Sequence, residues 1–220
     1  MSAARTPPQL TLVVAATLNN GIGVRGGLPW RLPREMAYFA QVTKSAGISS
    51  SDPSSIQQEK NAVIMGRKSW ESIPTKFRPL KDRLNVVISS QRELELNHPG
   101  PEDKTTPPPI LSSSFEDALA RISDSPLRNI FVIGGASIYA KALEHPTTTR
   151  ILLTRILEPA FDECDVFFPD FEKNGSWTRA SHSQLVDWVG FDVLEGVQEE
   201  KGIKYEFQLW VRKAAGNNSV

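Results

Sequence analysis

The sequence predicts an α/β protein with a mostly parallel central sheet, flanking helices and an antiparallel C-terminal strand. Short apolar runs bounded by Gly, Ser, Asn or Arg recur along the chain, as expected for strands that are buried on both faces. Near the end, the apolar residues Tyr205, Phe207, Leu209 and Val211 occupy every second position, which is typical of a half-buried strand at one side of the sheet. The earlier runs cover residues 10–16, 62–65, 86–88, 130–133 and 151–154.

Helical patterns lie between these runs and complete an alternation of strands and helices. Pro33 suits the first position of a helix, and Pro74 stops a short helical turn. Ser113 and Glu116 have the spacing of a capping box at the start of a third helix. We expect helices over 33–42, 69–73, 115–122 and 136–143.

The chain length favours one domain. Its 220 residues are predicted to form a single domain over 9–213, with 1–8 and 214–220 as flexible termini. Two polar insertions interrupt the pattern: 45–60 contains six serines and 92–109 contains five prolines. Strand signals resume directly after each insertion, so both are interpreted as surface loops and not as domain linkers.

Charge and cysteine content exclude several classes of protein. The chain has 25 Lys and Arg against 25 Asp and Glu, so it lacks the basic excess that nucleic-acid or membrane-surface binding needs. A single cysteine, Cys164, excludes an internal disulfide framework and a cysteine-based metal site, and it fits the reducing cytoplasm. The apolar run 10–18 has the length of a signal-peptide core, but Thr11 and Thr17 interrupt it and a turn follows at once. We expect no metal, no membrane anchor and a monomer.

A glycine-rich loop follows the first predicted strand. Four glycines lie between Gly21 and Gly27, and Leu28-Pro29-Trp30 comes next. Ligands of open α/β sheets bind at the carboxyl ends of the strands, where this loop is placed. A flexible turn is the alternative interpretation, but a fixed proline and a large aromatic ring are poor choices for a spacer.

The helix predicted after this loop carries one notable acid. Glu35 lies on the same helix face as Phe39 and next to Met36, so its carboxylate is directed beside an apolar stripe. An acid in the first turn of a helix is also common for a simpler reason, because it interacts favourably with the helix dipole. A partly buried Glu35 would instead bind a cationic or amide-like ligand edge, with a pKa altered by desolvation.

Two further segments suit phosphate groups. Gly66-Arg67-Lys68-Ser69 opens a helix after a strand, but Ala62 stands where a P-loop requires glycine. Between residues 60 and 92 there are eight basic residues and two acids, which favours an anionic small ligand over a merely solvated basic face. Gly134-Gly135 joins another strand to a helix and would allow a pyrophosphate to approach the backbone. It is not the Gly-x-Gly-x-x-Gly pattern of a standard dinucleotide fold.

Taken in order, these segments resemble dihydrofolate reductase of the eukaryotic, fungal kind. The resemblance covers the chain from about residue 10 to residue 211. It is carried by the following matches: Gly21-Ile22-Gly23, Leu28-Pro29-Trp30, Glu35 with Tyr38-Phe39, Val63 to Trp70, Ser72-Ile73-Pro74, Arg78 to Lys81, Arg83, Ile133-Gly134-Gly135 with Ile138-Tyr139, Thr154-Arg155, Phe167-Phe168-Pro169 and Glu199 to Tyr205.

The resemblance implies an oxidoreductase that reduces 7,8-dihydrofolate to 5,6,7,8-tetrahydrofolate with NADPH. Glu35 would be the acid of the pterin pocket, Thr154 would hydrogen-bond its carboxylate, and Trp30 would help to hold an ordered water. Arg83 would pair with the α-carboxylate of the folate glutamate. The other implied substrate-binding residues are Val13, Val14, Met36, Phe39, Ile73, Leu80, Ile133 and Tyr139.

The same resemblance assigns NADPH to the glycine-rich segments, with Arg67 on the 2′-phosphate. Two residues depart from the family pattern: Gly27 replaces a common acid or amide, and Ser90 lies where an arginine often contacts the 2′-phosphate. The implied cofactor-binding residues are Ala15, Ile22, Gly23, Gly26, Gly27, Leu28, Gly66, Arg67, Lys68, Ser69, Ser89, Ser90, Gln91, Gly134, Gly135, Ala136, Ser137, Ile138 and Tyr139.

Two other functions remain open at this point. A related pterin or pyrimidine reductase would share the fold, but we would not expect it to retain Glu35 together with Arg83. A non-catalytic NADPH-binding sensor would keep the phosphate-binding segments and lose the acid in the pocket. The expected partners are dihydrofolate and antifolate-type small molecules.

Overall fold

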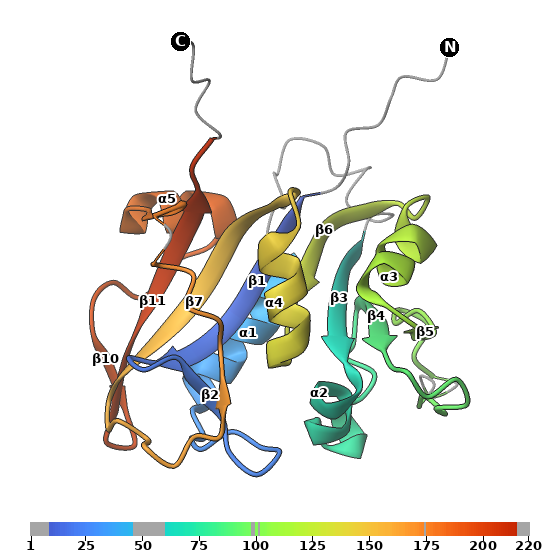
Figure 1. Ribbon diagram of the computed structural model, residues 1–220, viewed down its shortest axis with the longest axis horizontal. Helices are drawn as coiled ribbons and strands as arrows, with labels where there is room; N and C mark the ends of the chain where they lie inside the picture. The colour runs from blue at the N-terminus through green and yellow to red at the C-terminus, as the bar shows by residue number, and fades with distance from the viewer. Residues whose placement is uncertain (1–8, 46–59, 98–99, 101, 174, 215–220) are drawn as a thin grey trace.

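A nine-stranded sheet runs through the part of the chain that the structure, a computed structural model, describes: residues 9–45, 60–97, 100, 102–173 and 175–214. The strand order is β10-β11-β7-β1-β6-β3-β4-β5, and β9 pairs with β11 (Figure 1). The strands are β1 (Leu10–Thr17), β3 (Lys60–Gly66), β4 (Arg83–Ile88), β5 (Ile110–Ser112), β6 (Leu127–Val132), β7 (Thr148–Glu158), β9 (Trp177–Arg179), β10 (Gln198–Glu200) and β11 (Ile203–Arg212).

The pairing confirms the predicted α/β fold class. β1 lies between β6 and β7 and is parallel to both, and β3, β4 and β5 continue the sheet in the same direction. The C-terminal strand β11 is antiparallel to β7, as its alternating pattern predicts. Every predicted strand exists, and each is longer than its apolar core because sheet pairing extends into the polar residues at its ends.

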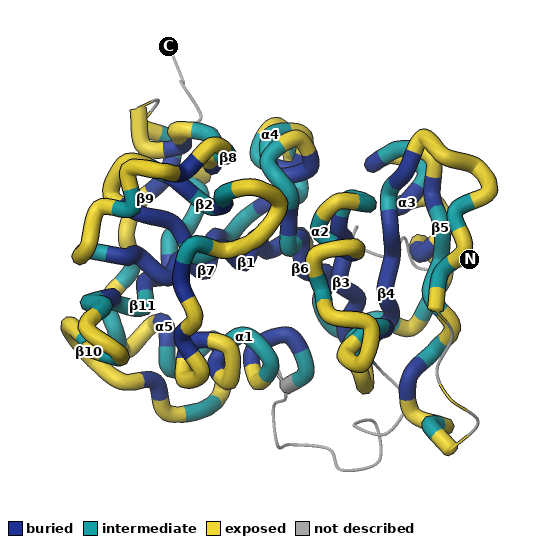
Figure 2. The backbone as a smooth tube through the Cα atoms, turned by 90° about the horizontal axis from the view of Figure 1, so that it is seen from below, coloured by how far each residue is buried: buried dark blue, intermediate teal, exposed yellow. Residues whose placement is uncertain are grey.

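Helices cover both faces of the sheet. On one face, α3 and α4 pack against residues such as Leu12 and Val14; on the other, α1 and α5 pack against residues such as Val13. Figure 2 shows α4 and α1 on opposite sides of the strands. The helices are α1 (Pro33–Ser45), α2 (Arg67–Ser72), α3 (Phe115–Ile122), α4 (Ala136–Glu144) and α5 (His182–Val189), with a 3₁₀ turn, η1, over Thr75–Phe77.

The C-terminal strand is more covered than its sequence suggests. Gln208, on the predicted polar face, is only 5% exposed. Phe171 and Trp177 pack near Trp210 on that face. This face is therefore more covered at Gln208 than predicted, because a segment that the local pattern could not place folds back over it, while Glu206, Trp210 and Arg212 stay partly exposed.

Several small elements were not predicted. α5 begins with a capping box between Ser181 and Gln184 and ends at Gly190, which is in the left-handed conformation. These signals are present in the sequence and could have located the helix. The strands β2 (Gly21–Gly23) and β8 (Val166–Phe167), which form a separate two-stranded sheet, are too short to give a periodic pattern.

The structure describes most of the second polar insertion, but only the ends of the first insertion and little of the two termini. Residues 46–59 of the first insertion lie outside the described residues, as do 1–8 and 215–220 at the ends. The described residues of 92–109 contain no helix or strand, in agreement with a loop. In the described part of the chain, no helix has both the length and the apolar character needed to cross a membrane.

The helix predicted over Phe115–Ile122 is confirmed, but its cap is not the predicted one. Ser114, and not Ser113, is the N-cap residue: its Oγ accepts a hydrogen bond from the Asp117 N–H at 3.0 Å. Ser113 instead donates its N–H to the Asp117 carboxylate at 2.8 Å. The predicted register was displaced by one residue because three consecutive serines, Ser112 to Ser114, precede the helix.

Ser114→Ala should lower the free energy of unfolding by about 1 kcal/mol, because the Asp117 N–H loses its acceptor. Ser113→Ala is the matched control and should change it by only a few tenths of a kcal/mol, since its hydroxyl contact is exposed and long at 3.3 Å. Urea denaturation measures both variants. An equal loss in the two variants would contradict the assignment of the cap.

Candidate active site

The glycine-rich and phosphate-type segments predicted from the sequence lie at the carboxyl edge of the parallel strands, whereas Arg83 lies at the start of β4, at the opposite edge. β1, β3, β4 and β6 all end at this edge, and α2 follows β3 there while β2 follows β1 (Figure 1). Ligands of open α/β sheets bind at this edge because the strand-to-helix loops converge there.

Glu35 lies in the first turn of α1 and is only 7% exposed. The Thr154 Oγ1, on β7, donates a hydrogen bond to its Oε1 at 3.2 Å. Burial raises the pKa of Glu35 to about 7; the Thr154 hydrogen bond opposes this rise, and the negative charge of Glu200 adds to it. The alternative of a solvated first-turn acid is therefore wrong, and Glu35 can take up or release a proton near neutral pH.

Apolar side chains cover the face of the sheet on which α1 packs. Five of the residues implied for the pterin pocket pack in one cluster together with Tyr38 of α1: Val13, Phe39, Ile73, Leu80 and Ile133. These residues come from β1, α1 and the segments that follow α2, η1 and β6. Only the tertiary fold brings them together.

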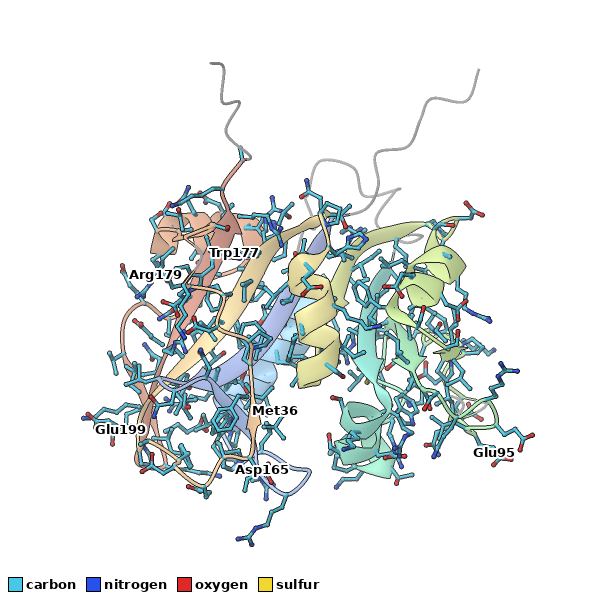
Figure 3. All side chains as sticks on the ribbon, viewed as in Figure 1. Met36, Glu95, Asp165, Trp177, Arg179 and Glu199 are labelled. Atoms are coloured by element: carbon cyan, nitrogen blue, oxygen red, sulfur yellow. The ribbon has the colours of Figure 1, made fainter. Side chains whose placement is uncertain are left out.

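Three residues of the implied pocket, Val14, Met36 and Tyr139, lie differently. Val14 belongs to the cluster on the opposite face, because successive residues of a strand point to opposite faces; only its backbone can contribute on the Glu35 side. Met36 is 50% exposed and lies in the lower half of the molecule in Figure 3, above Asp165. Ala15 packs beside Trp30 in a third cluster.

Buried donors without a protein partner lie among the aromatic residues of this region. Among the described residues, Trp30 Nε1 and Tyr205 Oη have no hydrogen-bond partner, and both side chains pack in one cluster with Leu32 and Ile156. Buried polar atoms of this kind are normally satisfied by water or a ligand. Tyr205 was predicted only as an inward-facing strand residue, because a local pattern cannot reveal the register that brings β11 beside β7.

Tyr139 links helix α4 to the first strand. Its hydroxyl donates to the Val13 carbonyl at 2.6 Å, and its ring is 4% exposed. A Cβ at Gly134 would lie 3.1 Å from this ring, so a larger residue there would displace it. Tyr139 therefore packs with Val14 on the face of the sheet opposite to the Val13 cluster, beside the double glycine, and only its hydroxyl reaches the backbone of β1.

Arg83 is buried at the start of β4 and is held in a defined orientation. Its Nη1 donates to Thr43 Oγ1 at 2.6 Å, and its Nε donates to the Lys81 carbonyl at 2.9 Å. Burial lowers the pKa of Arg83 to about 10, and the nearby Asp82 opposes this effect. The guanidinium thus stays charged at neutral pH, and Nη2 takes part in neither bond.

The geometry around the double glycine fits a pyrophosphate. Both α2 and α4 begin after a glycine N-cap, Gly66 and Gly135, with no side-chain capping bond. A Cβ at Gly66 would lie 3.3 Å from Ile138, and a Cβ at Gly135 would lie 3.4 Å from the Ser69 hydroxyl. The first N–H groups of these two helices, which no side chain caps, are suitable donors for phosphate oxygens.

Of the two basic residues beside the double glycine, Arg67 has an acidic partner within the protein. Arg67 Nη1 lies 2.9 Å from both carboxylate oxygens of Glu71 on the next turn, in an ion pair that is partly exposed to solvent. Lys68 is exposed. At the end of β4, the buried Ser89 accepts a hydrogen bond from the Gln91 N–H at 3.0 Å, and Ser90 is exposed.

Backbone pairing holds the glycine-rich loop in a defined conformation. Arg25 and Gly26 have positive φ angles of 48° and 81° between the bridged residues Val24 and Gly27. A Cβ at Gly27 would come no closer than 3.9 Å to another atom, so the departure from the family pattern there has no steric cause. Ile22 packs in the core, Gly23 pairs with Val166, and Leu28 is 54% exposed.

One residue outside the predicted set anchors this loop. Arg155 is 6% exposed and donates to the Thr17 carbonyl at 2.8 Å, to Asn20 Oδ1 at 2.9 Å and to Glu172 at 2.6 Å. A buried arginine in a strand is a signal for such a network, but its partners are distant in sequence.

Two other features bear on the choice of site. In the described residues there is no group of three or more His, Cys, Asp or Glu that could hold a metal ion. A hollow of about 470 Å³ lies beside β5, and none of the predicted site residues lines it. Glu95, which lines this hollow, lies far from Met36 in Figure 3. The hollow is lined by Leu94, Glu95, Leu96, Pro109 and Leu111.

Comparison with known proteins agrees with this geometry. The dihydrofolate reductase family model matches residues 9–49 and 55–189. The dihydrofolate reductase of Cryptococcus neoformans is 43% identical over an alignment covering 96% of this chain and 97% of its own, and that of Pneumocystis carinii is 41% identical over 92% and 96%. Both are fungal proteins, as the resemblance predicts.

The fold agrees as well. The solved structure of Schistosoma mansoni dihydrofolate reductase superposes with a TM-score of 0.72 at 30% identity, covering 94% of this chain and 100% of the other. With the family model matched over most of its length, this chain belongs to the dihydrofolate reductase family of oxidoreductases.

Proposed function

We propose that the protein reduces 7,8-dihydrofolate to 5,6,7,8-tetrahydrofolate with NADPH. The observation that carries the proposal is the buried Glu35, bonded to Thr154 at the edge of an apolar wall. A carboxylate in this setting can bind the amide N–H and amino group of a pterin ring. A cofactor-binding sensor would have no use for a carboxylate desolvated in this way, since its burial raises the energy of the charged form.

Glu35 fixes the ring and sets the proton supply of the reaction. With its pKa raised to about 7, it would stabilise a protonated state of the bound pterin near neutral pH, and a water bound at the unpartnered Trp30 Nε1 would carry the proton. Val13, Phe39 and Ile133 orient the ring and exclude bulk water from this side. When bound, NADPH supplies the hydride that C6 accepts while N5 takes a proton.

NADPH would be held by the uncapped starts of α2 and α4 and by the basic residues beside them. The first N–H groups after Gly66 and Gly135 would bind the pyrophosphate, and Arg67 and Lys68 would bind the 2′-phosphate. The Arg67–Glu71 ion pair does not prevent this, because exposed pairs contribute only about 0–1 kcal/mol and exchange readily.

Arg83 would bind the glutamate tail of the substrate. Its Nε and Nη1 hydrogen bonds fix the plane of the guanidinium, so a carboxylate meets a preorganised partner. Other ligands with a pterin-like edge, including antifolate-type small molecules, would use the same pocket.

Charge and cysteine chemistry support the remaining parts of the proposal. The balanced charge favours small-molecule partners over nucleic acid or a membrane surface, and the single free thiol, Cys164, favours the reducing cytoplasm. A monomer suffices for the activity, since the residues proposed for both ligands come from one chain.

Glu35→Ala should lower kcat by on the order of 10²–10⁴, because a positioned proton-carrying group is lost. The assay is NADPH consumption with dihydrofolate as the only added substrate, together with NADPH binding, which should barely change. In the wild type, the rate should fall as the pH rises through about 7, since Glu35 is protonated below its pKa and ionised above it. Near wild-type turnover by the variant would contradict the role of Glu35.

Arg67→Ala should reduce the preference for NADPH over NADH by about 1–3 kcal/mol, because only NADPH presents a 2′-phosphate to the guanidinium. The measurement is kcat/KM with each cofactor. Glu71→Gln is the matched control: it removes the ion-pair partner but keeps Arg67, so the preference should persist or increase slightly. Equal kcat/KM for the two cofactors in the wild type would rule out the assignment.

Arg83→Lys should raise KM for dihydrofolate and leave kcat nearly unchanged, because the tail lies far from the reacting atoms and its contact acts as uniform binding. A simple dihydropterin, which lacks the glutamate tail, provides the control and should be insensitive to the substitution. If both substrates were impaired equally, Arg83 would be a structural residue and not a ligand for the tail.

A further inference from the structure

The hairpin between β10 and β11 ends in a tight turn that orients one acid. Lys201 and Gly202 both have positive φ angles, 54° and 74°, and they join Glu200 to its strand partner Ile203. Two central residues of this conformation form the preferred two-residue hairpin turn. Glu200 is thereby held in register at the last position of β10.

Glu200 reaches the start of helix α1, 166 residues away in sequence. The Arg34 N–H lies 3.1 Å from one of its carboxylate oxygens and 3.4 Å from the other. This N–H belongs to the first turn of α1, where backbone donors have no partner within the helix. A carboxylate there also interacts favourably with the helix dipole.

The sequence before α1 explains why a distant acid is needed. Helices usually begin after Ser, Thr, Asp or Asn, whose side chain accepts a bond from the first turn. Here Arg31 and Leu32 precede Pro33, and neither side chain offers an acceptor. Glu200, on β10, supplies the acceptor that the local sequence lacks. The N–H that it binds belongs to Arg34, the residue directly before Glu35.

We propose that Glu200 is a positioning residue for Glu35: by accepting the Arg34 N–H, it fixes the first turn of α1 and so the placement of the Glu35 carboxylate against Thr154. The inference rests on the proposed function, because it deepens the role of the same acid. It assigns a task to the β10–β11 turn, which the binding of neither ligand uses.

Glu200 also acts on Glu35 through its charge. The two carboxylates repel each other, which adds to the rise in the pKa of Glu35 that burial causes. The other titratable groups whose charge interacts with this pair are Tyr38 on α1, Tyr139 on α4 and Tyr205 on β11, and Arg34 in turn interacts with Tyr205. The tyrosines are neutral at neutral pH, and burial raises the pKa of each further. Glu200 is therefore the acidic neighbour whose removal changes the charge near Glu35.

Two substitutions separate the hydrogen bond from the charge. Glu200→Gln keeps an oxygen that can accept the Arg34 N–H and removes the charge, whereas Glu200→Ala removes both. Glu199→Gln is the matched control, because Glu199 has the same charge and strand but is exposed, and Figure 3 shows its side chain projecting outward from the edge of the molecule.

The measurements are kcat, KM for each substrate across the pH range that spans the pKa of Glu35, and NADPH affinity by fluorescence. In the ligand-free protein, isotope-edited infrared spectroscopy follows the titration of the Glu35 carboxyl. Glu200→Ala should lower kcat about tenfold with an unchanged NADPH affinity, because Glu35 loses its alignment. Glu200→Gln should retain kcat at low pH. In both variants the Glu35 titration and the fall in rate should move to lower pH, and Glu199→Gln should change neither.

Distinct results would overturn the inference. A Glu200→Ala enzyme with wild-type kcat would show that the Arg34–Glu200 hydrogen bond does not position Glu35 for the reaction. Loss of NADPH binding in that variant would instead indicate that Glu200 has a general structural role. An unmoved Glu35 titration in Glu200→Gln would exclude the charge effect, even if Glu200→Ala failed to fold. A wild-type protein that does not reduce dihydrofolate would remove the proposed function instead, while the titration of Glu35 would still test its coupling to Glu200.

Discussion

The desolvation of one carboxylate is the constraint around which the site is arranged. Burying an acid is costly unless it is hydrogen-bonded, and Glu35, which is only 7% exposed, accepts a hydrogen bond from the Thr154 hydroxyl. Its proton is therefore retained to near neutral pH. Thr154 and the start of α1 must both stay in place for this balance to persist, so the carboxylate couples β7 and α1.

A second constraint is the close approach of backbone at the carboxyl edge of the sheet. The Gly66 N–H donates to the Gly134 carbonyl at 2.7 Å, and the Tyr139 ring and the Ser69 hydroxyl occupy the space that side chains on Gly134 and Gly135 would need. These contacts bring the starts of α2 and α4 together without capping side chains. The same glycines thus serve packing and leave backbone donors open to a ligand.

The charged groups divide by burial into two kinds. Arg83 and Arg155 are nearly inaccessible to solvent, and each makes several hydrogen bonds to backbone or side-chain oxygens, so their orientations are fixed before any ligand arrives. Arg67 is paired with Glu71 near the surface, where ion pairs are weak and exchangeable. Preorganised groups suit contacts that set geometry, and exchangeable ones suit the recognition of a mobile phosphate.

The sequence by itself determined the order of the main strands and of helices α1 to α4, the antiparallel last strand and the positions of Glu35, Arg83 and the double glycine, because these depend on local apolar periodicity and on residue types that bear their own chemistry. It could not show that Val14 faces away from Glu35's side, that Ser114 caps α3, or that Trp30 and Tyr205 pack together. Nor could it reveal that Glu200 reaches Arg34. Such contacts join residues far apart in the chain or depend on a register shift of one residue, and only the pairing of β11 with β7 and the packing of α1 on the sheet decided them.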